Sequence, residues 1–138
     1  VANAVPEHAW CKVDVRFAKS EGIERIDRDF KDIAARQYVN DTTTVVKPLM
    51  VFPAMERLSA SETLFARAEA VAETYRFPKM KAIAVGGGSD SANLTAVGIP
   101  TLCALGVKGE VNHTEREWAD EASLYERAKL LRAFLCEL

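Results

Sequence analysis

The alternation of apolar and polar positions predicts two strands and a helix in the first part of the chain. In residues 10–17 every second side chain is apolar and the others are mostly charged, which is typical of a half-buried strand. Apolar residues then recur at three- and four-residue intervals over residues 20–38, which predicts an amphipathic helix capped by Ser20. Residues 42–52 are rich in β-branched side chains and predict a second strand, and Pro48 indicates a sheet edge. This part is therefore predicted to be β–α–β.

Pro53 breaks regular structure and indicates a joint between two lobes. After it, helices and buried strands are predicted to alternate. Helices are expected over residues 61–75, over residues 91–97 and near the C-terminus. Two continuous apolar runs, residues 82–85 and 99–105, predict strands covered on both faces. The order α–β–α–β–α predicts an α/β fold with a parallel sheet flanked by helices. The last helix is expected to bury one stripe: Leu124, Ala128, Leu131, Leu135 and Leu138.

Composition narrows the class of protein. The 138 residues are 49% hydrophobic and 28% charged, which is typical of a globular domain or two small lobes. The net charge of −2 argues against a general nucleic-acid surface. Because no apolar run approaches the ~20 residues that cross a bilayer, no membrane span is expected. The odd number of cysteines without CxxC spacing (Cys11, Cys103 and Cys136) predicts reduced thiols in a cytoplasmic protein.

A glycine-rich turn over residues 86–90 connects a predicted strand to a predicted helix. Three glycines and a small polar pair expose backbone N–H groups at a helix start, which can bind a phosphate or carboxylate. The spacing matches neither dinucleotide-binding nor P-loop motifs. The alternative is a tight turn in which Ser89 or Asp90 only caps the helix.

Two further side chains are candidates for chemistry. His113 lies in a predicted loop, residues 106–120, after a buried strand, where it could bind a metal or exchange protons; the alternative is an exposed loop histidine. Arg16 lies on the polar face of the first predicted strand and could bind a carboxylate with two hydrogen bonds. The alternative pairs Arg16 with Asp14. His8 is expected to be a surface residue.

Three segments resemble the C-terminal part of one enzyme family: NAVPEHAWCKVDVRF, GGGSDSANLTAVGIPTLCALGVKGEVNHTEREW and SLYERAKLLRAFL. It is the dinuclear zinc family of glutamate carboxypeptidase, aminoacylase, acetylornithine deacetylase and succinyl-diaminopimelate desuccinylase. In that family a ferredoxin-like lid, which commonly mediates dimerisation, interrupts a catalytic α/β domain. The resemblance implies that residues 1–53 are the second half of the lid. Residues 54–138 would be the C-terminal part of the catalytic domain.

The resemblance also implies roles for individual residues. His113 matches a histidine that ligates one zinc ion. Asn3 and Arg16 match lid residues that hold the carboxylate end of the substrate. Asp90 would hold the glycine turn in place, and Glu117 would have a structural role or orient a metal ligand through a hydrogen bond. In that family one loop lines the substrate pocket, and it matches Gly87, Gly88 and Ser89.

The remaining catalytic groups of that family have no counterpart in this sequence. They are the first zinc histidine, a bridging aspartate, a general-base glutamate, another acidic ligand and a lid histidine. The reaction needs two ions ~3.5–4 Å apart and a carboxylate that moves the proton. Because the chain begins at Val1 and lacks these groups, we expect a C-terminal fragment that is inactive alone. Cys103 and Asn112 depart from the family pattern, which leaves the substrate open.

The resemblance implies a zinc-dependent hydrolase of short peptides or N-acyl amino acids with a free carboxylate, with cobalt or manganese as other possible metals. No nucleic-acid or membrane partner is expected. Two alternatives stay open. The chain could be a non-catalytic association module that forms a homodimer or strand-exchanged oligomer through the edge near residues 42–44, since an unprotected sheet edge invites pairing. It could also be a small anion-binding α/β domain that uses the glycine turn.

Overall fold

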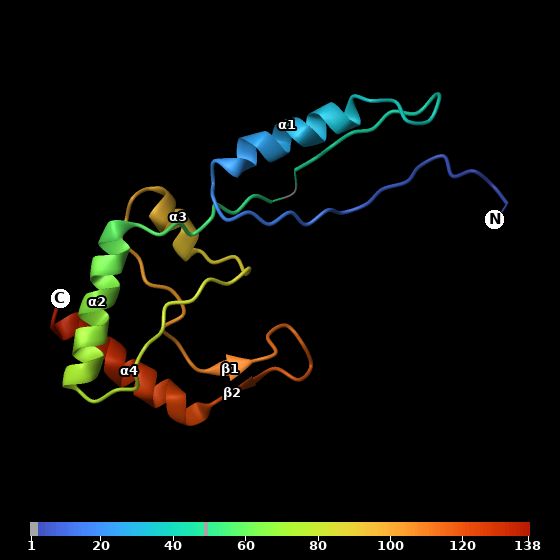
Figure 1. Cartoon of the computed structure of the whole chain (residues 1–138). Helices are drawn as coiled ribbons and strands as arrows, with labels where there is room; N and C mark the ends of the chain where they lie inside the picture. The colour runs from blue at the N-terminus through green and yellow to red at the C-terminus, as the bar shows by residue number, and fades with distance from the viewer. Residues whose placement is uncertain (1–2, 49) are drawn as a thin grey trace.

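The computed structural model describes residues 3–48 and 50–138, so Leu49, within the predicted second strand, lies outside the described residues (Figure 1). The elements follow one another in the order α1 Gly22–Ala34, α2 Ser59–Thr74, α3 Ser91–Ala96, β1 Gly109–Glu110, β2 Trp118–Ala119 and α4 Glu121–Cys136. The two short strands pair antiparallel. Within the described ranges, no helix is both long enough and apolar enough to cross a membrane.

The helix predictions are confirmed, although their bounds differ by a few residues. α1 lies within the predicted residues 20–38, and α2 and α3 nearly coincide with the predicted ranges. α4 begins after Asp120, whose side chain accepts a hydrogen bond from the Ala122 N–H at 3.0 Å, so its start is capped. The prediction that Ser20 caps α1 is wrong, because α1 has no side-chain cap.

Ser20 instead joins the two parts of the chain. Its backbone N–H donates to Oε1 of Glu56 at 2.9 Å, and its hydroxyl accepts from the Ala54 N–H at 3.1 Å. The chain entering α1 and the chain leading to α2 therefore lie side by side at this point (Figure 1). We call these three residues the Ser20 joint.

The four predicted strands, residues 10–17, 42–52, 82–85 and 99–105, are not paired strands in the described part of the chain. These segments run as extended or irregular chain (Figure 1). Alternating side chains favour an extended backbone, but a strand also needs a neighbouring backbone to bond with. Many of their apolar side chains accordingly stay exposed, such as Trp10 at 83% and Ile83 at 70%. The mixed helix-and-strand composition is confirmed, but the parallel sheet is not present among the described residues, whose one sheet is the antiparallel pair β1 and β2. The ferredoxin-like lid and the division at residue 53 stay predictions.

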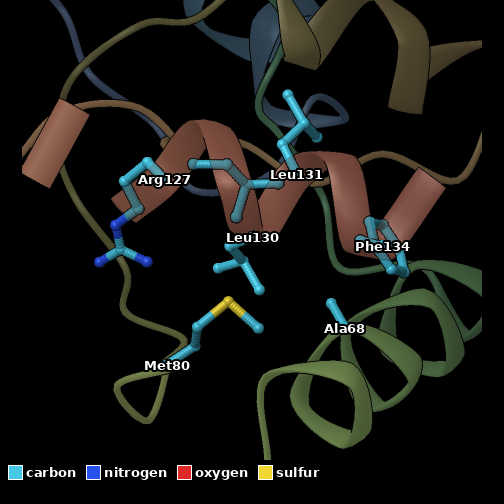
Figure 2. A pocket seen from close by; sticks show the side chains of 7 residues that line it. Ala68, Met80, Arg127, Leu130, Leu131 and Phe134 are labelled. Carbon is cyan, nitrogen blue, oxygen red and sulfur yellow. The ribbon is translucent and has the colours of Figure 1, made fainter. Parts of the chain in front are cut away.

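The core forms where α2 packs against α4. Ala68 and Ala72 on α2 are small, so Leu130 and Phe134 of α4 lie close to that helix. Met80, from the segment after α2, points between the two helices (Figure 2). The predicted stripe of α4 is wrong: Leu124, Leu131, Leu135 and Leu138 are 43–60% exposed. α4 carries apolar residues on two faces, and the face with Leu130 and Phe134 meets α2.

Candidate functional site

Arg16 lies between an acidic side chain and the glycine turn. Its Nη1 donates to the carbonyl oxygen of Gly86 at 3.0 Å. Its Nε and Nη2 donate to Oδ2 of Asp14 at 3.3 and 3.0 Å. The structure therefore joins two separate sequence predictions: Arg16 pairs with Asp14, and it also contacts the predicted substrate loop 70 residues further along the chain.

Phe52 lies beside the same turn. A Cβ placed on Gly88 would lie 3.9 Å from Cγ of Phe52, an ordinary van der Waals distance. Phe52, Gly88, Ser89 and Asp90 line an open hollow of about 390 Å³. The two extended segments of the N-terminal part thus reach the glycine turn at two points, since Arg16 donates to Gly86 and Phe52 lines the hollow beside Gly88.

Ser89 holds the turn together from within. Its hydroxyl accepts from the Ser91 N–H at 3.2 Å and lies 3.1 Å from Sγ of Cys103. Hydrogen bonds from Ser89 and then from Ser91 lower the pKa of the Cys103 thiol. We expected Asp90 to pin this turn, but its side chain makes no cap hydrogen bond, and Ser89 has that role instead.

The start of α3 offers little to an anion. The N–H groups of Ser91, Ala92 and Asn93 donate to oxygens of Ser89 and Asp90 at 3.2, 2.9 and 3.0 Å. α3 is also only six residues long, so its dipole is small. These contacts favour the turn-and-cap alternative for the helix start over an anion-binding one.

His113 lies in the turn of a short β-hairpin, within the residues 106–120 for which we predicted a loop. β1 and β2 pair Gly109 with Ala119 and Glu110 with Trp118, and His113 lies in the turn between them. A Cβ on Gly109 would collide with the carbonyl oxygen of Trp118, so this pairing requires glycine. The sequence signal for the hairpin is weak, because each strand has only two residues.

The turn that carries His113 has its own hydrogen bonds. The His113 N–H donates to Oε2 of Glu117 at 3.0 Å, and the Thr114 hydroxyl donates to the Val111 carbonyl at 2.7 Å. His113 adopts φ +66°, a left-handed conformation that is uncommon for residues other than glycine. His113 is an exposed residue, so its side chain is not buried among apolar neighbours.

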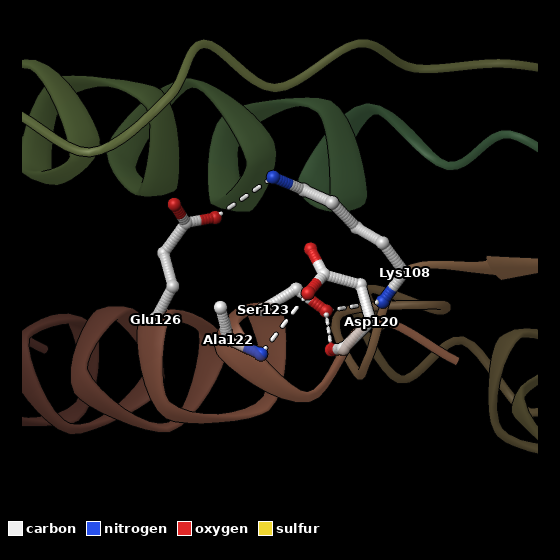
Figure 3. Close-up of polar contacts among 5 residues, drawn as sticks. All are labelled: Lys108, Asp120, Ala122, Ser123 and Glu126. Atoms are coloured by element: carbon white, nitrogen blue, oxygen red, sulfur yellow. Dashed lines mark hydrogen bonds and ion pairs between the residues drawn. The ribbon is translucent and has the colours of Figure 1, made fainter.

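The base of the hairpin is fixed to the start of α4 (Figure 3). The Lys108 N–H donates to Oγ of Ser123 at 2.8 Å, and Ser123 donates to the Asp120 carbonyl at 2.6 Å. The Asp120 N–H in turn donates to the Lys108 carbonyl at 2.8 Å. Nζ of Lys108 also pairs with Oε1 of Glu126 at 3.0 Å. The hairpin therefore leaves the core in a fixed direction, with His113 at its far end.

The described residues do not complete a metal site. Among them, no three histidine, cysteine, aspartate or glutamate side chains lie close enough to hold one ion. A catalytic zinc ion takes three protein ligands and an open position, and His113 supplies one. The donor set thus does not fit a metal within residues 3–48 and 50–138, and no reaction step follows from it.

Among the described residues, no hydrogen bond joins Asn3 to Arg16 or to the glycine turn. Within the described part of the chain, Asn3 makes no side-chain hydrogen bond, and Arg16 meets Asp14 and Gly86 instead. Asn3 therefore stays a prediction, whereas Arg16 and the glycine turn lie together. Sequence reasoning missed Phe52, which we placed in a strand, and it found no structural link between Ser89 and Cys103.

The comparisons give the family. A model of peptidase family M20/M25/M40 matches residues 21–137, which include the glycine turn, His113 and Glu117. This chain belongs to peptidase family M20/M25/M40. The broad resemblance stated from the sequence is thereby confirmed, and M20 peptidases are hydrolases that generally depend on a metal. No curated protein and no solved structure matches the chain. Arg16 and Asn3 precede the matched residues.

Proposed function

We propose that the chain forms the carboxylate-binding part of a metal-dependent M20 hydrolase. Its substrates would be short peptides or N-acyl amino acids with a free carboxylate. The observation that carries this proposal is the contact of Arg16 with Gly86, which puts a guanidinium beside the glycine turn. The Arg16 side chain is 68% exposed, so a ligand can reach it. A planar guanidinium matches the two oxygens of a carboxylate.

The hollow beside this contact supplies the rest of the proposed subsite. Gly88 and Ser89 line it, which supports their proposed role in substrate binding, and the Phe52 ring adds an apolar surface. Gly87 precedes them in the same turn and keeps its proposed place in the loop. A substrate whose carboxylate binds Arg16 could lay its neighbouring side chain against Phe52. This combination of a cationic end and an apolar wall suits an amino-acid residue with a free C-terminus.

The metal assignment is a separate part of the proposal. We place His113 as a ligand of zinc, or of cobalt or manganese, in a site that needs further ligands. Because the described residues offer no cluster of three ligands, we expect the chain alone not to hydrolyse substrate. Purified chain, incubated with zinc and a panel of dipeptides and N-acyl amino acids, tests this. Zinc-dependent hydrolysis by the chain alone would contradict it.

The carboxylate site can be tested without turnover. N-acetyl-L-alanine and its carboxamide differ in the charged end, so a titration followed by ¹H–¹⁵N NMR compares them directly. We expect the carboxylate to shift the amide signals of Gly86, Gly87 and Gly88 at lower concentration than the carboxamide. R16M should remove this preference. Equal binding of both compounds to the unaltered chain would contradict the proposed function.

A second function, association with another copy of the chain, is favoured by one observation. Large apolar side chains are exposed on the predicted strands, including Trp10 at 83%, Val45 at 75% and Ile83 at 70%. Exposed apolar residues on unpaired extended segments favour pairing between chains. A homodimer or a strand-exchanged oligomer would cover them. Analytical ultracentrifugation without metal tests this proposal, and a single monomeric species across the micromolar range would contradict it.

A further inference from the structure

We propose that Asp14 is a positioning residue that orients Arg16 for a substrate carboxylate. This inference rests on the proposed function, because it deepens the role of the same site. It starts from the observation that Asp14 and Arg16 are two positions apart on an extended segment. Side chains at such positions point to the same side of the backbone, so the pair is built into the local chain direction. Asp14 would act through Arg16 and would not touch the substrate itself.

The hydrogen bonds of Arg16 show which part of the guanidinium is held. A guanidinium carries five N–H donors. Oδ2 of Asp14 accepts one from Nε at 3.3 Å and one from Nη2 at 3.0 Å, and the Gly86 carbonyl accepts one from Nη1 at 3.0 Å. One N–H therefore remains on each terminal nitrogen. When these two N–H groups lie along the Nη1–Nη2 edge, they can donate to both oxygens of a carboxylate.

The exposure of the pair decides which effect of Asp14 is larger. The Asp14 side chain is 71% exposed and that of Arg16 is 68% exposed. Water and salt therefore weaken both the repulsion between Asp14 and an incoming carboxylate and the attraction within the Asp14–Arg16 pair. The two hydrogen bonds to Oδ2 of Asp14 act at short range and still direct the guanidinium. Water does not restrict the rotamers of the long arginine side chain, so without Asp14 these rotamers would have to be fixed when the ligand binds. Asp14 holds the Nε edge, and this contact fixes the guanidinium plane before the ligand arrives. We therefore expect the orienting effect to exceed the repulsion.

Two substitutions at Asp14 separate orientation from charge. D14A removes both the negative charge and the acceptor of the Nε–H bond. D14N removes the charge but keeps an oxygen that can accept from Nε. Positioning predicts that D14A binds N-acetyl-L-alanine about fivefold more weakly than the unaltered chain, whereas D14N stays within about twofold of it. Competition between Asp14 and the ligand predicts the opposite, with tighter binding by both variants.

The measurement is the same NMR titration, with the carboxamide as the second probe. Binding of the carboxamide should be equal in the unaltered chain, D14A and D14N, because Arg16 does not pair with an uncharged end. The Arg16 Nε–H signal gives an independent readout, and its exchange with water should be faster in D14A. A purely structural role of Asp14 would change binding of both probes together.

Asp29 offers a matched control. It pairs with Arg25 at 3.7 Å on α1, and its side chain is 60% exposed. D29A removes the same charge from the same part of the chain and should leave both titrations unchanged. Circular dichroism of each variant checks that the helices are retained.

The outcomes distinguish this inference from the function on which it rests. If the unaltered chain does not prefer the carboxylate, or if R16M keeps the preference, the proposed function is wrong. If the preference exists and depends on Arg16, but D14A binds the carboxylate as well as or better than the unaltered chain, the function stands and the positioning role of Asp14 is wrong. Weaker carboxylate binding by D14A, with rescue by D14N, supports it.

Discussion

The backbone N–H of His113 donates a hydrogen bond to Oε2 of Glu117, at 3.0 Å. Both residues lie in the turn between β1 and β2, and two residues of that turn, Val111 and His113, have positive φ angles of +54° and +66°. A left-handed conformation costs a non-glycine residue roughly 1–2 kcal/mol. Such a conformation persists when the surrounding contacts hold it, and the carboxylate of Glu117 supplies one of them.

Removing this carboxylate should loosen the turn. We expect Glu117→Ala to speed hydrogen exchange of the His113 amide by about tenfold, because a hydrogen bond from a backbone N–H to a charged acceptor is lost. Mass spectrometry or NMR of amide exchange measures this. Glu115→Ala is the control, since within the described residues Glu115 makes no side-chain hydrogen bond or ion pair. Equal protection of His113 in both variants would refute the role of Glu117.

The positive φ of His113 predicts an inverted order of two substitutions. Glycine adopts φ +66° without strain, whereas alanine does not, although glycine loses more entropy on folding. We expect the free energy of unfolding, measured by urea denaturation, to be about 0.5–1 kcal/mol larger for His113→Gly than for His113→Ala. The same pair at Glu115, whose φ is not positive, should show alanine as the more stable. Alanine more stable at both positions would contradict the left-handed turn.

Gly109 should be hard to replace. A Cβ at this position collides with the carbonyl oxygen of Trp118, which is backbone and cannot turn aside. We expect Gly109→Ala to lower the free energy of unfolding by roughly 1–3 kcal/mol and to separate β1 from β2. Gly106→Ala is a matched control three residues earlier, since a Cβ there meets no atom within 4 Å. Thermal unfolding of the two variants compares them, and equal midpoints would count against the hairpin.

The thiol of Cys103 should react at a lower pH than an ordinary cysteine thiol. Hydrogen bonds from Ser89 and Ser91 lower its pKa, and thiolate is the reactive form. We expect the pH midpoint of iodoacetamide alkylation at Cys103, measured by mass spectrometry, to lie below that of free cysteine. Ser89→Ala should raise the midpoint of Cys103, and an unchanged midpoint would contradict the role of Ser89. Because the folded pKa lies below that of the unfolded thiol, this group adds stability as pH rises between the two values and loses it as pH falls.

The helices could be predicted from the sequence because their signals are local. Residues 61–75 contain alanine, leucine and glutamate at helical spacing, and α2 forms there at Ser59–Thr74. The buried face of α4 could not be predicted in the same way. Two helical stripes, one with Leu131 and one with Leu130 and Phe134, are both apolar, and only contact with α2 decides between them.

The strands and the site show the same limit. Residues 10–17 alternate as a strand should, but alternation does not specify a partner backbone, and these residues stay unpaired. Arg16 and the glycine turn could each be found from residue type and position. Their contact is between residues 70 positions apart, so no local pattern could predict it. The hairpin of His113 was missed because it rests on a close approach at Gly109.

The Ser20 joint has a mechanical consequence. Arg16 and Phe52 each lie a few residues from the joint, on the two chain segments that meet there; Arg16 donates to the glycine turn, and Phe52 lines the hollow beside it. A small rotation about the joint would displace the Arg16 guanidinium and the Phe52 ring together. The depth of the hollow and the alignment of the cation would therefore change in a single movement.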